Sequence, residues 1–164
     1  MIRVLVSACL LGEKVRYNGA DAAAASRILE EWRAEGRVVP FCPEVAGGLG
    51  VPRPAAEILG PGGASVLDGA GRVVTREGAE VTEAFLRGAE LALQTARAHG
   101  VHLAVLKEGS PSCGSGFVYD GSFSGRKTAG YGVTTALLER GGIRVFSEVR
   151  LEAAAGYQRE LEGR

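Results

Sequence analysis

The chain has 164 residues, 46% of them hydrophobic, which allows one domain with a sizeable core and leaves no room for a second full domain. Lys and Arg together number 19, as do Asp and Glu, so the formal net charge is zero. This balance excludes the broad positive field that holds a long nucleic acid through many phosphate contacts. We therefore expect a single domain over residues 1–164 whose partner is a small molecule and not a long nucleic acid.

The apolar run at the start of the chain, residues 2–11, is too short to cross a membrane and lacks a signal-peptide cleavage pattern. We therefore expect a cytoplasmic protein with no membrane partner. Disulfides are rare in that compartment because thiols are kept reduced. The chain has three cysteines, and an odd number suits a shared set of ligands better than a set of bridges.

Four short apolar runs, rich in β-branched residues, are typical of strands buried on both faces of a parallel sheet. They are residues 2–6, 38–41, 101–106 and 143–146. Apolar residues at helical spacing predict helices over residues 22–35, 81–98, 134–140 and, as a C-terminal tail, 148–164. Strands that alternate with helices predict an α/β fold, a single-domain three-layer Rossmann-like parallel sheet flanked by helices. No GxGxxG follows the first strand, so we do not expect a dinucleotide site.

Two glycine-rich stretches interrupt this alternation. Residues 46–71 also contain prolines, and Asp68-Gly69 within them predicts a hairpin turn. Residues 114–132 are rich in Gly, Ser and aromatic residues. Long excursions inside a compact domain are usually functional or mobile. The second excursion carries three aromatic residues that we expect either to pack in the core or to stack on a flat heterocycle: Phe117, Tyr119 and Phe123.

Each cysteine comes shortly after a predicted strand. Cys9 follows the first strand in SACLLG, Cys42 the second in FCPE, and Cys113 the third in SPSCG. The carboxyl ends of parallel strands lie at one edge of the sheet, where open α/β sheets bind their ligands. A single free cysteine is more often a small buried core residue. Three of them at equivalent strand ends predict a shared reactive site.

Three thiolates are compatible with more than one kind of metal site. A structural zinc ion would need a fourth ligand, and His99 and His102 flank the start of the third strand, at the wrong end. An open zinc site would suit a deaminase, but the H-x-E and C-x-x-C pattern of those enzymes is absent. A 4Fe–4S cluster held by three cysteines keeps one iron open to a substrate. We therefore favour the cluster.

Other polar residues are expected at the same edge. Glu44 could give or take a proton beside a metal-bound substrate, or it could simply cap a turn or pair with Arg53. The hydroxyls of Ser110 and Ser112 could orient a small polar ring, although they also suit an ordinary turn. Lys107 ends an apolar strand, where a charge is costly unless it is used or paired.

Five motifs, in this order, resemble the thiouracil desulfidase family over residues 3–148. They are SACLLG with RYNG, FCPEVAGGLGVPR, GRVVT with VTEAFLRGA, LKEGSPSCGSGFVYDGSFSG, and GVTTALLERGGIRVFSE. The resemblance implies a 4Fe–4S cluster on the three cysteines, with the fourth iron free to take the sulfur of a thiolated pyrimidine. It also implies that the glutamate of the CPE motif is catalytic, together with one of the two serines of SPSC.

The implied activity is the removal of sulfur from a thiolated nucleobase or nucleoside to give the oxo-compound and hydrosulfide, without net redox chemistry. Longer family members continue into a second domain, so this chain resembles a short single-domain form. Two other functions stay open from the residues. One is an iron–sulfur or zinc protein that senses or stores sulfur or metal without catalysis. The other is a nucleotide- or phosphate-binding module in which the cysteines play no part.

Overall fold

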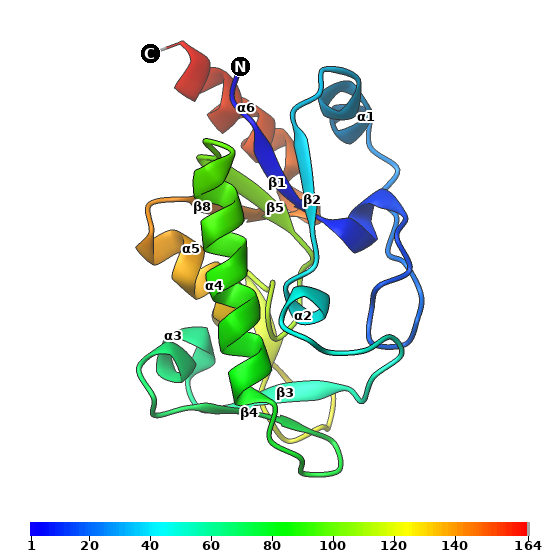
Figure 1. Cartoon of the computed structure of the whole chain (residues 1–164), viewed down its shortest axis with the longest axis vertical. Coiled ribbons are helices and arrows are strands. Elements are labelled where there is room, and N and C mark those ends of the chain that lie inside the picture. The colour runs from blue at the N-terminus through cyan, green and yellow to red at the C-terminus, as the bar shows by residue number, and fades with distance from the viewer. Residues whose placement is uncertain (164) are drawn as a thin grey trace.

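The computed structural model describes residues 1–163, and a parallel sheet lies at the centre of one end of the molecule (Figure 1). Its strands are β1 (Val4–Ser7), β2 (Val38–Phe41), β5 (Leu103–Leu106) and β8 (Arg144–Ser147). They lie in the order β2-β1-β5-β8, and Val4 of β1 pairs with Val38 on one side and Leu103 on the other. All four runs predicted as strands are confirmed, with ends displaced by at most two residues.

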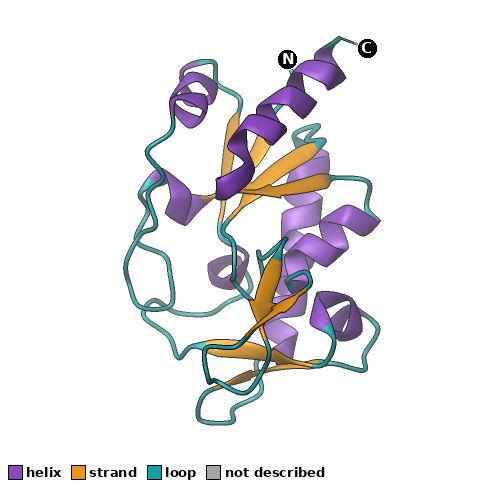
Figure 2. Ribbon diagram, turned by 180° about the vertical axis from the view of Figure 1, so that it is seen from behind, coloured by secondary structure: helices purple, strands orange, loops and turns teal. Residues whose placement is uncertain are grey.

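Helices cover both faces of this sheet, which confirms the three-layer α/β fold. Helices α1 (Arg27–Ala34) and α6 (Leu151–Glu162) lie on one face, and α4 (Thr82–Ala98) and α5 (Val133–Arg140) lie on the other (Figure 2). Val4 and Val6 of β1 pack toward α1 and α6, whereas Leu5 packs toward α4 and α5. Because successive side chains point to opposite faces, a strand covered on both sides must be apolar throughout. Within residues 1–163, no helix is long and apolar enough to cross a membrane.

Helix α1 is shorter than the predicted span of residues 22–35. It begins at Arg27 because the Ser26 hydroxyl caps it, accepting the N–H of Leu29 at 3.3 Å. Before the cap, the N–H groups of Ala22 and Ala24 bond to backbone carbonyls just after β1. These two hydrogen bonds fix the 3-10 turn (Ala8–Leu11) that follows β1.

The two glycine-rich excursions form antiparallel strand pairs below the carboxyl edge of the sheet (Figure 1). Strand β3 (Ala56–Leu59) pairs with β4 (Arg72–Thr75), and β6 (Phe117–Tyr119) pairs with β7 (Lys127–Ala129). The hairpin predicted around Asp68-Gly69 is present as the antiparallel β3–β4 pair, but its connection is longer than a tight turn, because α3 (Gly62–Leu67) precedes the turn at Asp68-Gly69. A separate hydrophobic cluster packs this lower part against α4 and α5.

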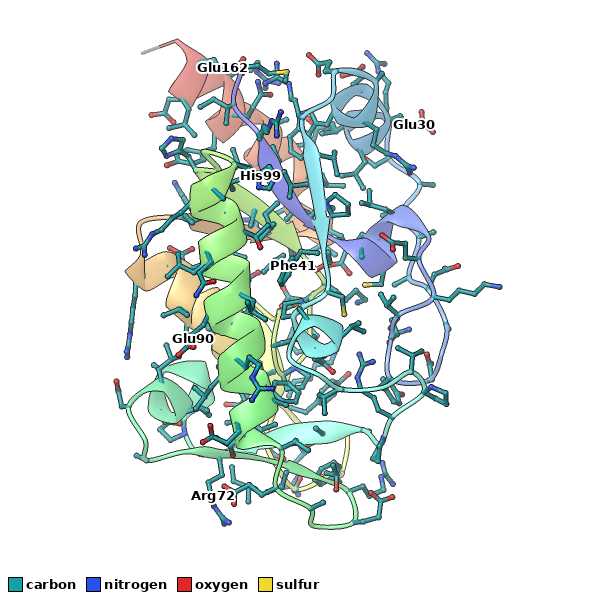
Figure 3. The ribbon with its side chains drawn as sticks, in the orientation of Figure 1. Glu30, Phe41, Arg72, Glu90, His99 and Glu162 are labelled. Carbon is teal, nitrogen blue, oxygen red and sulfur yellow. The ribbon has the colours of Figure 1, made fainter. Side chains whose placement is uncertain are left out.

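The C-terminal helix is tied to the start of the sheet by an ion pair. Arg37, whose side chain is 10% exposed, donates to the Glu162 carboxylate and to the Ile2 carbonyl. The same carboxylate accepts the Ile2 N–H at 2.9 Å. Glu162 lies at the end of α6, close to the N-terminus (Figure 3). The Arg37 hydrogen bond lowers the pKa of Glu162 to about 2.

This pKa predicts a pH dependence of stability. A carboxylate with a lowered pKa stabilises the fold above its ordinary pKa of 4.5, and that contribution is lost as the pH falls toward about 2. Urea unfolding between pH 5 and 2 should show a shallower fall in the free energy of unfolding for Glu162→Gln than for the wild type. Glu152→Gln, on the same helix, should keep the wild-type slope. Equal slopes for all three proteins would contradict the role of this pair.

Candidate functional site

The three cysteines lie at one edge of the sheet, as predicted. Strand β1 has β2 and β5 as its neighbours, so the segments that follow these three strands start side by side. Cys9 lies in a 3-10 turn after β1, Cys42 immediately precedes the short helix α2 (Pro43–Ala46), and Cys113 lies in the loop after β5. All three are free thiols, and they line one cavity of about 410 Å³.

Close packing between two helices sets the position of Cys42 and Glu44. Helix α2 lies directly against α4, and a Cβ atom on Gly88 of α4 would come within 2.1 Å of the Pro43 carbonyl oxygen. A Cβ on Gly47 would likewise come within 2.1 Å of the Ala84 carbonyl oxygen. Only glycine allows this approach, which explains the glycine within the motif VTEAFLRGA.

The start of helix α5 holds the loop that carries Cys113. The Ser112 carbonyl accepts the N–H groups of Thr134 and Thr135, at 2.9 and 3.2 Å. The Thr135 hydroxyl donates to the Cys113 carbonyl at 2.9 Å. Gly132 permits this contact, because a Cβ there would lie 2.4 Å from the Ser112 carbonyl carbon. The Cys113 backbone is thus fixed by a helix that lies far along the chain.

Burial makes the cysteine thiols hard to ionise. It raises the pKa of Cys9 to about 11, with the nearby Cys42 adding to the effect, and it raises the pKa of Cys113 to about 12. Burial raises the pKa of Cys42 as well. Metal ligation requires thiolates. Thiolates here would need the positive charge of a bound metal centre.

The spacing of the donors distinguishes between metal centres. Within residues 1–163, no three His, Cys, Asp or Glu side chains are grouped so that they could hold one metal ion. Thiolates on a single tetrahedral zinc ion would stand about 3.8 Å apart, given Zn–S bonds of about 2.3 Å. In a 4Fe–4S cluster each cysteine binds a different iron, so the sulfurs stand farther apart. Two buried cysteines and the half-buried Cys42 around a shared cavity suit a cluster, in which each thiolate binds a different iron.

Two hydroxyl groups lie near the Cys113 sulfur. The Ser112 Oγ is 3.4 Å from the Cys113 Sγ, and the Ser7 Oγ is 3.8 Å from it. The Ser7 Oγ also accepts the N–H of Lys107 at 2.9 Å, which leaves its own proton free to point at the sulfur. Hydrogen bonds to cysteine sulfurs are one way in which a protein tunes a bound cluster.

Glu44 contacts both Arg53 and the two serines of the SPSC motif. Its Oε1 accepts a hydrogen bond from the Arg53 Nε at 3.0 Å, and the two side chains are 14% and 7% exposed. Its Oε2 accepts the hydroxyls of Ser112 at 2.8 Å and Ser110 at 3.3 Å. Arg53 is also anchored by bonds to the Val15 and Gly50 carbonyls. The carboxylate is thus held by an arginine beside two hydroxyl groups and the cavity.

The two serines differ in exposure and in partners. Both line the cavity, but Ser112 is 1% exposed, whereas Ser110 is partly exposed. Their Oγ atoms are 2.9 Å apart. The Ser110 Oγ accepts the N–H groups of Ser112 and Cys113, so this hydroxyl is fixed in place. Ser112 connects the more exposed Ser110 to Glu44, which forms a continuous path for a proton.

Lys107, His99 and the loops around the cavity are also singled out by their place in the sequence. Lys107 is paired with Glu148 at 2.9 Å, as its position at the end of an apolar strand requires. His99 lies at the opposite end of the sheet from Phe41 (Figure 3) and bonds to the Thr95 carbonyl. Both the RYNG loop and the second excursion reach the cavity. The lining residues from these segments are Arg16, Tyr17, Tyr119, Phe123 and Gly125.

Sequence reasoning did not identify several residues of the cavity. In the sequence, a pair with Arg53 is the alternative to a catalytic role for Glu44. In the structure, the pair with Arg53 holds Glu44 beside the cavity. Glu57, within the first excursion, and Arg76, just after β4, also line the cavity. Their only sequence signal was their position in or just beyond a long glycine-rich stretch. Phe117 is not among the lining residues and packs edge-on against Tyr119, with ring centroids 5.9 Å apart.

Glu108 organises the loop that presents the serines and Cys113. Burial by itself would raise the pKa of this carboxyl, but hydrogen bonds from backbone N–H groups outweigh it and leave the pKa below its ordinary value. All four N–H groups reach the same oxygen, Oε1, at 2.9 to 3.3 Å. They belong to Gly109, Ser115, Gly116 and Phe117.

Replacing Glu108 should loosen this loop. In Glu108→Ala the four N–H groups lose their acceptor, so we expect the free energy of unfolding to fall by about 1–3 kcal/mol. In iron-free protein, alkylation of Cys113 followed by mass spectrometry should become faster. Glu108→Gln keeps a carbonyl oxygen in the same place and should lose less than half as much stability. An equal fall in the free energy of unfolding in the two variants would show that the acceptor oxygen of Glu108 does not stabilise the loop.

Comparisons with known proteins agree over nearly the whole chain. A family model described as 2-thiouracil desulfurase matches residues 4–150. The Bacillus subtilis (strain 168) protein YbbK is 47% identical over 148 residues, which cover 90% of this chain and 97% of that protein. A solved structure of TudS, a 4Fe–4S-dependent thiouracil desulfidase, is 51% identical with a TM-score of 0.89, covering 96% of this chain and 98% of that one.

Proposed function

The chain belongs to the 2-thiouracil desulfurase family, and we propose on this basis that it is a 4Fe–4S-dependent thiouracil desulfidase. The observation that carries the proposal is the cavity in which three cysteines, two of them buried, meet a carboxylate and two serines. The reaction exchanges the thiocarbonyl sulfur of the substrate for the oxygen of water. It yields the oxo-compound, hydrosulfide and a proton, with no net transfer of electrons.

Cys9, Cys42 and Cys113 are the residues that would hold the cluster. When bound, a cluster with three cysteine ligands supplies an open iron that acts as a Lewis acid toward the thiocarbonyl sulfur. The Ser7 hydroxyl can donate to the Cys113 sulfur and stabilise negative charge on it, whereas the one hydroxyl proton of Ser112 is donated to Glu44.

Glu44 is the residue that we propose moves the proton. Arg53 holds its Oε1, which leaves Oε2 to take a proton through the serine hydroxyls. Ser110 is the more exposed of the two serines, and we assign it the contact with the substrate or the attacking water. Ser112 then passes the proton between Ser110 and Glu44. General acid–base catalysis of this kind typically contributes about 10²–10⁴-fold to a rate.

The ligand assignment predicts a specific metal content. Wild-type protein reconstituted without oxygen should bind about four irons and four sulfides per chain, and each of Cys9→Ser, Cys42→Ser and Cys113→Ser should lower this content sharply. Ser147→Ala is a matched control, because Ser147 is buried but does not line the cavity. Iron content that is indifferent to the cysteines would overturn the assignment.

The proton-transfer assignment predicts a loss of turnover without a loss of cluster. Glu44→Gln keeps the shape of the side chain but cannot shuttle a proton, so kcat for 2-thiouracil should fall by about 10²–10⁴-fold. Ser110→Ala should also lower kcat. The visible spectrum and iron content should match the wild type, and Glu30→Gln on the exposed face of α1 should be fully active. Wild-type turnover in Glu44→Gln would refute its role, and a loaded wild type without turnover would favour sulfur or metal storage.

A further inference from the structure

The cavity has a second wall, built by the two excursions and separate from the cysteine edge. The segment leading into β3, together with β3 itself and the residue after β4, meets the β6–β7 segment there, and β3 and β6 are in contact. Within residues 1–163, no residue of this wall is hydrogen-bonded to a cysteine. The wall is formed by Ala55, Ala56, Glu57, Arg76, Tyr119, Phe123 and Gly125.

Phe123 has an unusual backbone conformation in this wall. Its φ of 55° makes it the one non-glycine residue with positive φ within residues 1–163. The left-handed region costs a residue with a Cβ atom about 1–2 kcal/mol. Such strain persists only where the surroundings hold it, and it is concentrated at functional sites. A phenylalanine here, where glycine would be unstrained, indicates that its ring is needed.

Glu57 is the residue that holds this conformation. Its Oε1 accepts the N–H of Gly121 at 2.9 Å and the N–H of Phe123 at 3.2 Å. Both bonds run from β3 to the tip of the β6–β7 connection, across 64 and 66 residues of sequence. One carboxylate oxygen thus fixes the backbone on both sides of Ser122, and with it the direction of the Phe123 side chain.

Arg76 supports the ring. Its guanidinium lies over the Phe123 ring, 5.7 Å from the centroid, and its own backbone N–H bonds to the Ala55 carbonyl. Phe123 is half-buried and lines the cavity, so ring surface not covered by Arg76 is available to a ligand. A rigid aromatic face beside a cavity suits the stacking of a flat heterocycle.

We propose that Phe123 is the stacking platform for the pyrimidine ring and that Glu57 is the positioning residue that presents it. This inference rests on the proposed function, which supplies a flat ring as substrate. Glu57 acts through the backbone of the loop and makes no contact with the reacting atoms. The pair sets the affinity for planar substrates, while the cysteine edge carries the chemistry.

The test compares four variants of the cluster-loaded protein with the wild type: Glu57→Ala, Glu57→Gln, Phe123→Leu and the double variant Glu57→Ala/Phe123→Leu. The readouts are KM and kcat for 2-thiouracil, iron content, and the Kd of uracil by calorimetry. Glu57→Ala and Phe123→Leu should each raise KM and Kd roughly tenfold, within the range of one stacking interaction, with kcat and iron content unchanged. Glu77→Ala is the matched control, an exposed carboxylate just beyond β4, and should behave as wild type.

Two results identify the mechanism of the effect. Glu57→Gln keeps an acceptor oxygen for the two N–H groups, so its Kd should stay near that of the wild type. The double variant should bind uracil with the same Kd as Phe123→Leu alone, because both changes remove the same interaction. Two outcomes would overturn the inference and point to direct contact between Glu57 and the substrate. One is a Kd of Glu57→Gln raised as much as that of Glu57→Ala, and the other is a loss of affinity in the double variant equal to the sum of the two single losses.

The failure of this inference is distinguishable from the failure of the proposed function. Normal KM and Kd in Glu57→Ala and Phe123→Leu, in an enzyme that turns over 2-thiouracil, would overturn the platform and leave the desulfidase intact. A loaded wild type that neither turns over 2-thiouracil nor binds uracil would overturn both.

Discussion

Parallel pairing of β1 with β2 on one side and β5 on the other is the constraint on which the rest of the structure depends. Because the three strands run the same way, their carboxyl ends come together, and each continues directly into a segment that carries a cysteine. The sheet is buried on both faces by four helices, which makes these strand ends rigid. The chemistry then depends on short segments with little freedom to move.

Carboxylates hold the backbone of the glycine-rich loops around the site by accepting their N–H groups. Glu108 gathers four backbone N–H groups of the loop that carries Cys113, and Glu57 gathers two at the tip of the β6–β7 connection. Glu44 is held by Arg53 in the same region but faces hydroxyl groups instead of backbone. Two of these acids therefore shape the cavity, and the third is available for proton transfer.

The cysteines and Glu44 differ in the contacts that surround them in the cavity. Burial raises the pKa of the cysteines, so their thiolates depend on a bound metal centre for charge. Glu44 is also largely buried, but Arg53 and two hydroxyls supply the compensating contacts directly. Positive charge therefore lies directly against Glu44, whereas burial dominates at the cysteines, which fits the proposed division between cluster-binding cysteines and a proton-transferring carboxylate.

The sequence by itself determined the four strands, the main helices, the shared edge of the cysteines and the candidate acid and hydroxyl groups, because these follow from hydrophobic periodicity and from motifs close to strand ends. Only the tertiary structure decided the start of α1, where a serine cap and bonds to the turn after β1 override the helical pattern. The same is true of α3, which lies before the turn at Asp68-Gly69 and lengthens the connection between β3 and β4. It also decided that Arg53 holds Glu44 and that Glu57 holds Phe123. The Glu57 contact joins residues 66 positions apart, and such contacts have no local pattern because they depend on how separate segments pack.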